Sequence, residues 1–131
     1  MIYSKKVQDL IISPDFSLLR ALRRMDEVKR KLLLVFTENQ YVGLLSIGDI
    51  QRAIINSIDI NSDVSVIIRR DYTVVGEDES IEVVKRKMLS TRAEFMPVVS
   101  NGGELVHVYF WEDLFGLNEL PPPKQFNLPV V

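Results

Sequence analysis

The sequence repeats one pattern of apolar and polar residues at a period of about 63 residues, and this repeat constrains the fold more than any other feature. Residues 13–18 align with residues 76–81, and Asp49 aligns with Asp113. A single copy would leave a strand edge and an apolar sheet face exposed to water. We therefore expect an α/β (α+β) fold in which two strand-helix-strand-strand-helix units pack about a pseudo-two-fold axis.

In the first copy, Pro14 ends an apolar segment over residues 7–12, and apolar residues then recur at helical spacing. This spacing predicts a helix over residues 17–30, with one face formed by Leu18, Leu19, Leu22, Met25 and Val28. Apolar runs over residues 32–36 and 41–45 flank a polar turn and predict two strands. The helix that follows carries on one face Ile50, Ala53, Ile54 and Ile58.

The second copy repeats this order. A strand-like segment at residues 72–75 precedes a helix that begins after Ser80 and carries Ile81, Val84 and Met88. Residues 96–99 and 105–110 predict a hairpin whose turn has one residue more than the turn of the first copy. A last helix is expected near Leu114.

Composition limits the classes of function. At 131 residues and 47% hydrophobic residues, the chain can bury a core without disulfides. A net charge of -2 gives no electrostatic footprint for nucleic acid or an anionic membrane, and no window reaches the length of a membrane span. The absence of cysteine excludes thiolate metal sites and a cysteine nucleophile, and His107, the only histidine, lies in a strand-like run. We expect a cytoplasmic chain that binds no metal and is not itself an enzyme.

The second apolar run of the first copy leads directly into a helix through Ser46, and Asp49 follows three residues later. The first N–H groups and the dipole of a helix attract phosphate, and a nearby carboxylate can accept hydrogen bonds from both hydroxyls of a ribose. The same pattern approximates a capping box, in which both side chains satisfy the first backbone donors of the helix. On the sequence, a nucleotide site and a structural cap both remain open.

The sequence Gly-Leu-Leu-Ser-Ile-Gly-Asp at residues 43–49 resembles the motif that ends the third strand of a CBS domain, and Met-Pro-Val-Val at residues 96–99 resembles the second-strand motif of that family. The resemblance implies a pair of CBS domains, also called a Bateman module. Its parts would be one repeat at residues 1–60, a second at residues 61–118, and a proline-rich linker at residues 119–131. It further implies a non-catalytic, often dimeric module that senses adenosine nucleotides (AMP, ADP or ATP), requires no cofactor, and regulates an attached enzyme or transporter.

The resemblance also implies roles for individual residues of the first half. Ser46 would contact phosphate, and Asp49 would hold the ribose hydroxyls. Ile12 and Leu33 would form apolar walls for the base, and Lys31 would be a further phosphate partner.

The second half departs from this pattern. It keeps Asp113, but Phe110 stands at the hydroxyl position, Glu112 adds negative charge, and Glu94 aligns with Lys31. Hydrogen bonds to charged groups contribute about 1.5–3 kcal/mol each, so the loss of a hydroxyl and the gain of carboxylates should weaken this site. We expect one nucleotide site per chain, in the first half.

A narrower resemblance concerns Gly-Asp-Ile-Gln-Arg-Ala-Ile at residues 48–54, which is similar to CBS pairs that precede sugar-phosphate nucleotidyltransferase domains in bacterial surface-polysaccharide pathways. Residues 121–124 have the composition of a polyproline spacer, and residues 127–131 resemble the lead-in to the first strand of such a domain. A regulatory fragment linked to a nucleotidyltransferase is implied, and a plain C-terminal tail is the alternative. A second class of function also stays open, namely a dimerising interaction module whose grooves no longer bind a ligand.

Overall fold

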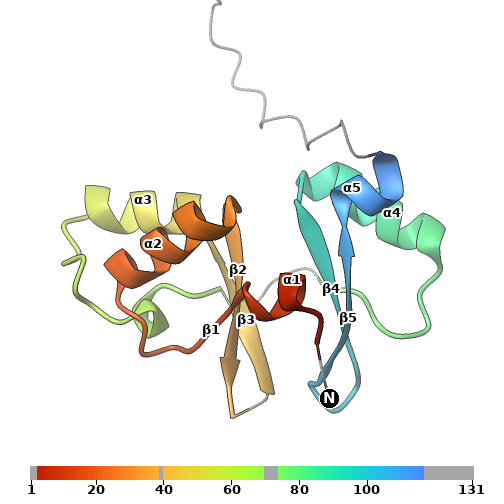
Figure 1. Cartoon of the computed structure of the whole chain (residues 1–131), viewed down its shortest axis with the longest axis horizontal. Helices are drawn as coiled ribbons and strands as arrows, with labels where there is room; N and C mark the ends of the chain where they lie inside the picture. The colour runs from red at the N-terminus through yellow and green to blue at the C-terminus, as the bar shows by residue number, and fades with distance from the viewer. Residues whose placement is uncertain (1–2, 39, 70–73, 117–131) are drawn as a thin grey trace, which may run out of the picture.

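The computed structural model of the chain describes residues 3–38, 40–69 and 74–116 (Figure 1). The first half contains α1 (Lys5–Gln8), β1 (Ile11–Ile12), α2 (Leu18–Val28), β2 (Leu32–Thr37), β3 (Gln40–Ser46) and α3 (Ile47–Ile55). A short 3-10 helix, η1 (Val64–Val66), precedes the second half, which contains α4 (Ile81–Thr91), β4 (Phe95–Val99), β5 (Leu105–Phe110) and α5 (Trp111–Phe115). The mixed order of helices and strands confirms the predicted fold class.

Strand pairing is the same in both halves. Ile12 pairs in parallel with Val35, and one repeat later Val75 pairs in parallel with Val98. β2 and β4 each continue into an antiparallel hairpin, with β3 and β5 respectively. The register shifts directly after Val35 in the first hairpin and directly after Val98 in the second. The repeat seen in the sequence is thus a repeat of backbone geometry, although part of the predicted strand at residues 72–75 lies outside the described residues.

The long helix of each half begins and ends in the same way. Ser17 caps α2 and Ser80 caps α4, each by accepting a hydrogen bond from the backbone N–H three residues later, at 3.0 Å and 3.3 Å. Both helices end at a residue in the left-handed conformation, Lys29 and Arg92, each with φ of 57°. The helix starts predicted at these serines are confirmed.

Three local predictions are corrected by the structure. The apolar segment at residues 7–12 is divided, because Ser4 caps the short helix α1 and only the last two residues pair as β1. Ile54 is 45% exposed although Ile50 and Ala53 of the same predicted face are buried, and Ile58 lies beyond the end of α3. The last helix begins at Trp111, earlier than the expected Leu114.

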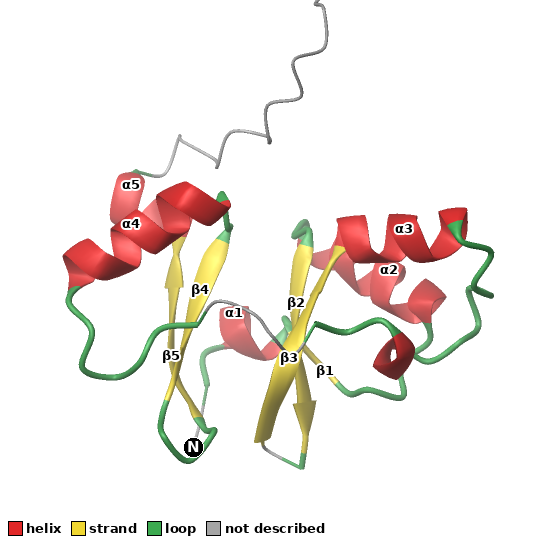
Figure 2. Ribbon diagram, turned by 180° about the vertical axis from the view of Figure 1, so that it is seen from behind, coloured by secondary structure: helices red, strands yellow, loops and turns green. Residues whose placement is uncertain are grey.

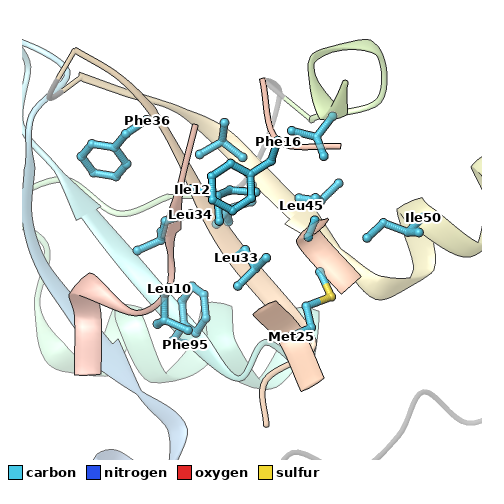
Figure 3. Close-up of a cluster of buried hydrophobic side chains, with 14 of the residues drawn as sticks. Leu10, Ile12, Phe16, Met25, Leu33, Leu34, Phe36, Leu45, Ile50 and Phe95 are labelled. Atoms are coloured by element: carbon cyan, nitrogen blue, oxygen red, sulfur yellow. The ribbon is translucent and has the colours of Figure 1, made fainter. Parts of the chain in front are cut away.

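The two halves lie side by side and share a core. Their hairpins face each other in the middle of the molecule, with α2 and α3 on one outer side and α4 and α5 on the other (Figures 1 and 2). In the larger core cluster, first-half residues pack with Phe95, Leu105, Val108 and Phe110 of the second half. Figure 3 labels Phe95 and Leu10 among the side chains of this cluster. A smaller cluster within the second half comprises Val75, Val84, Met88, Met96, Val98 and Trp111.

The segment after α3 packs back on the first half. The Val64 N–H donates to the Phe16 carbonyl at 2.8 Å, and the backbones of Arg69 and Leu44 form an isolated antiparallel bridge. The predicted boundary at residue 60 assigns residues 61–69 to the second repeat. In the structure these residues lie against the first half. The predicted linker at residues 119–131 lies outside the described residues. In the part of the chain that is described, no helix is both long and apolar enough to cross a bilayer.

Candidate functional site

Ser46 begins α3 and forms a reciprocal capping box with Asp49. The Ser46 hydroxyl accepts a hydrogen bond from the Asp49 N–H at 3.1 Å, and Asp49 Oδ2 accepts one from the Ser46 N–H at 2.9 Å. The next N–H, that of Ile47, donates to the carbonyl of Lys31 at 2.9 Å. The structural cap is therefore formed, and it fixes the Asp49 carboxylate at the start of the helix.

Asp49 carries the one buried charged side chain among the described residues, with 7% exposure. Its Oδ1 accepts hydrogen bonds from Arg52 Nη2 at 2.6 Å and from Arg69 Nε at 2.9 Å. Burial by itself raises the pKa of Asp49, but hydrogen bonds from Ser46 and Arg69 outweigh it and lower that pKa below its usual value. Asp49 is therefore ionised at neutral pH.

Two guanidinium groups lie beside this carboxylate. The side chains of Arg52 and Arg69 remain 60% and 49% exposed. A Cβ atom at Gly48 would lie 3.4 Å from Arg52 Nη1, an ordinary van der Waals distance, so the guanidinium lies directly beside the first turn of α3. With the positive end of the helix dipole, these cations attract anions. We call Ser46, Gly48, Asp49, Arg52 and Arg69 the α3 site.

The sequence pattern did not indicate either arginine as a site residue. Arg52 follows Asp49 by three positions on one helix, a spacing that could have predicted the contact. Arg69 is 20 positions from Asp49 and reaches it because the bridge to Leu44 holds the returning chain beside β3. Only the tertiary structure shows this second contact.

The structure brings together only some of the residues predicted for the first site. Lys31 is exposed and lies next to the start of α3, because its carbonyl accepts from Ile47. Leu33 pairs with Leu45 and has no exposed surface, and Ile12 is 2% exposed. Buried side chains offer no surface to a ligand, so in this conformation these two support the sheet from the core side.

The predicted acidity of the second half is compensated by the first half. Glu112 accepts hydrogen bonds from Arg30 Nη2 at 2.6 Å and from Lys6 Nζ at 2.8 Å. The Arg30 hydrogen bond is the largest of the effects that lower the pKa of Glu112 to about 2. The Glu94 carboxylate accepts from the Lys31 N–H at 3.0 Å, although its burial raises its pKa. Both carboxylates are thus already partnered, so the expected repulsion of phosphate is smaller than free carboxylates would give.

Asp113 lies in the first turn of α5, where Phe110 occupies the cap position without a side-chain hydrogen bond. The side chain of Asp113 is exposed and lines a groove of about 360 Å³ between α1 and β5. The groove is mixed in character and is lined by Tyr3, Ser4, Lys6, Val7, Val106, His107, Val108, Phe110 and Asp113. The second half therefore has a groove but lacks the hydroxyl and the arginine pair of the α3 site.

A family model described as CBS domain matches residues 4–56 and 62–117. The chain belongs to the CBS-domain family. The two matched segments correspond to the two structural repeats, so the molecule is a tandem CBS pair.

Comparison with known proteins agrees with this assignment. The CBS pair is 35% identical over 69 residues to the uncharacterised protein MJ1225 of Methanocaldococcus jannaschii, a match that covers 53% of this chain and 25% of that protein. The match thus spans about a quarter of that relative's length. Similar solved structures include an uncharacterised conserved protein from Pyrococcus horikoshii, with 25% identity, a TM-score of 0.68 and coverage of 87% and 86% of the two chains. A structure of CBSX2 in complex with AMP shares the fold at 24% identity and a TM-score of 0.68, covering 82% and 85%.

Proposed function

We propose that this CBS pair is a non-catalytic regulatory module that binds an adenosine nucleotide at the α3 site. The observation that carries the proposal is the buried, ionised Asp49 at the start of a helix, between two half-exposed arginines. The carboxylate suits the hydroxyls of a ribose, and the helix end with its guanidinium groups suits phosphate. The AMP bound to CBSX2, which has the same fold, supports an adenosine ligand.

Thermal unfolding in the presence of nucleotides tests this proposal. AMP, ADP or ATP at about one hundred times its dissociation constant should add roughly 2.7 kcal/mol of stability, or about 5–10 °C for a domain of this size. Asp49→Ala should remove the ligand-dependent shift, and loss of the cap should itself cost about 0.5–2 kcal/mol. Asp113→Ala is the matched control at the aligned position and should keep the shift.

Two results would contradict a single site in the first half. One is the absence of any shift with the three nucleotides. The other is a calorimetric stoichiometry of two nucleotides per chain, with Asp113→Ala reducing binding as much as Asp49→Ala does.

We further propose that the module is attached to a sugar-phosphate nucleotidyltransferase domain. Its support is the sequence at residues 48–54 and the proline-rich composition at residues 121–124. The sequence that follows Val131 in the parent gene tests it. A glycine-rich nucleotide loop directly after Val131 is expected, and its absence from a longer chain would contradict the attachment.

A second candidate function is a homodimeric interaction module, and one observation favours it. Two neighbouring large apolar side chains are exposed at the end of α3, Ile55 at 78% and Ile54 at 45%. Exposed apolar side chains that lie together mark protein interfaces. A homodimer can also bind nucleotide, so both functions can hold together. A dimer that binds no nucleotide would favour the interaction module over the nucleotide-binding module.

A further inference from the structure

The Asp49 carboxylate has too few open acceptor positions to take two hydroxyl groups in the conformation observed. A carboxylate offers about four acceptor positions, two on each oxygen. The Ser46 N–H takes one position on Oδ2, and Arg52 and Arg69 take two positions on Oδ1. About one position remains, so a ligand that presents two neighbouring hydroxyls must displace at least one arginine.

Displacement of the arginines requires little rearrangement. Both arginine side chains are about half exposed, so water can solvate a guanidinium group that leaves the carboxylate, while the hydroxyls of the ligand would take its place on the buried Asp49. The backbone of Arg69 is held by two hydrogen bonds to Leu44, at 3.1 Å and 3.2 Å, so only its side chain has to move. Arg52 already lies beside Gly48 in the first turn of α3. A displaced guanidinium therefore stays close to the helix end that attracts phosphate.

We propose that Arg52 and Arg69 act as internal ligands of Asp49, which release the carboxylate to the ribose of a nucleotide and contact its phosphate instead. This inference rests on the function proposed above. A nucleoside must break an arginine–carboxylate contact without supplying another anion, whereas a nucleotide replaces that contact with a phosphate contact. The arginine pair thus makes the site selective for phosphorylated ribose. Binding of the nucleotide also changes the position of the Arg69 side chain, which lies in the segment between the halves.

The aligned position in the second half is arranged differently. One repeat before Arg69 lies Lys6, whose Nζ contacts Glu112 at 2.8 Å. The neighbouring Asp113 remains exposed. Among the described residues, an aspartate that accepts hydrogen bonds from two arginines therefore occurs in the first half, and the exposed Asp113 is the aligned aspartate with which it can be compared.

Calorimetric titration with adenosine, AMP and ADP tests the inference on the whole chain. Arg69→Gln should bind adenosine several-fold more tightly, because one competing donor is gone. The same variant should bind AMP about tenfold more weakly or worse, because a charge-assisted contact to phosphate is lost. The ratio of the adenosine to the AMP dissociation constant should fall toward one. Arg86→Gln, which removes an exposed arginine of α4, is the charge-matched control and should leave both constants unchanged.

The outcomes separate this inference from the proposed function. If wild-type protein binds AMP and Arg69→Gln weakens adenosine and AMP by the same factor, Arg69 has only a structural role and the inference is wrong. If the wild type binds none of the three probes, the proposed function and this inference are both wrong.

A measurement on the wild type keeps the test valid if the variant does not fold. The Nε–H resonance of Arg69, assigned through covalent connectivity, should move when AMP is added, because the hydrogen bond to Asp49 is exchanged. An unchanged resonance at saturating AMP would overturn the inference.

Discussion

At the scale of single residues, one acidic side chain in each half is bound by a basic residue from the segment that leads into the opposite half. Asp49, in the first half, accepts from Arg69, which lies between the halves. Glu112, in the second half, accepts from Lys6, which lies near the N-terminus, and from Arg30. Lys6 and Arg69 occupy aligned positions of the repeat. These contacts therefore tie each half to the chain segment that leads into the other.

The Glu112 contacts predict a pH dependence of stability. The pKa of Glu112 is lowered to about 2 in the folded protein, so its contribution is complete above the unfolded value of 4.5 and is lost as pH falls toward 2. Glu112→Gln should reduce the free energy of unfolding by about 1–2 kcal/mol at pH 7, and this difference should shrink below pH 4.5. Urea unfolding of both proteins at pH 7, 4.5 and 3 measures it. A difference that stays constant over this range, or an equal effect of the exposed control Glu77→Gln, would argue against the ion pair.

At the scale of elements, the long helix of each half ends on a non-glycine residue in the left-handed conformation. Lys29 ends α2 and Arg92 ends α4, each with φ of 57°. This conformation costs most L-residues roughly 1–2 kcal/mol, whereas glycine adopts it readily. The left-handed residue occurs at aligned positions of the two helices, so this backbone conformation is part of the repeated structure.

Glycine at these two helix ends should stabilise the protein. Lys29→Gly and Arg92→Gly should each raise the free energy of unfolding by about 0.5–1 kcal/mol, because the gain in backbone conformation exceeds the extra entropy of the unfolded chain. Thermal and urea unfolding measure the change. Lys85→Gly within α4 is the control and should destabilise by about 1 kcal/mol. Destabilisation by all three substitutions would contradict this account of the helix ends.

At the scale of the whole molecule, the shared core should make the two halves unfold together. The single tryptophan, Trp111, is 4% exposed and lies in the cluster confined to the second half, so its fluorescence reports on that half. Far-ultraviolet circular dichroism reports on all helices and strands. We expect the two signals to give the same urea midpoint, since Phe95 and Phe110 belong to a core made mostly by the first half. Separate midpoints would show that the halves unfold independently.

The proposed homodimer is also a property of the whole molecule. Ile55→Glu replaces the large apolar side chain that is most exposed among the described residues with a charged one, and it should shift the protein toward monomer. Light scattering coupled to size-exclusion chromatography measures the mass. Val66→Glu changes a 63% exposed residue of η1 and should leave the mass unchanged. A wild-type monomer at micromolar concentration would contradict the dimer.

The sequence by itself determined the repeat, the order of helices and strands, the serine caps and the capping pair of Ser46 and Asp49. These features depend on apolar periodicity and on hydrogen bonds between residues three positions apart, so they are readable in one short window. The replacement of Lys31 by Glu94 and the added Glu112 in the second half were also visible, but their electrostatic consequence was not.

The tertiary structure alone decided which charges meet over long separations in the sequence. Arg69 reaches Asp49 across 20 positions, and Lys6 reaches Glu112 across 106. Such contacts depend on how the segment after α3 returns to β3 and on how the hairpins face each other, and no local pattern encodes either. For the same reason, Leu33 and Ile12 could be predicted as apolar walls of a site but not as side chains almost without exposed surface, because burial depends on packing by the whole chain.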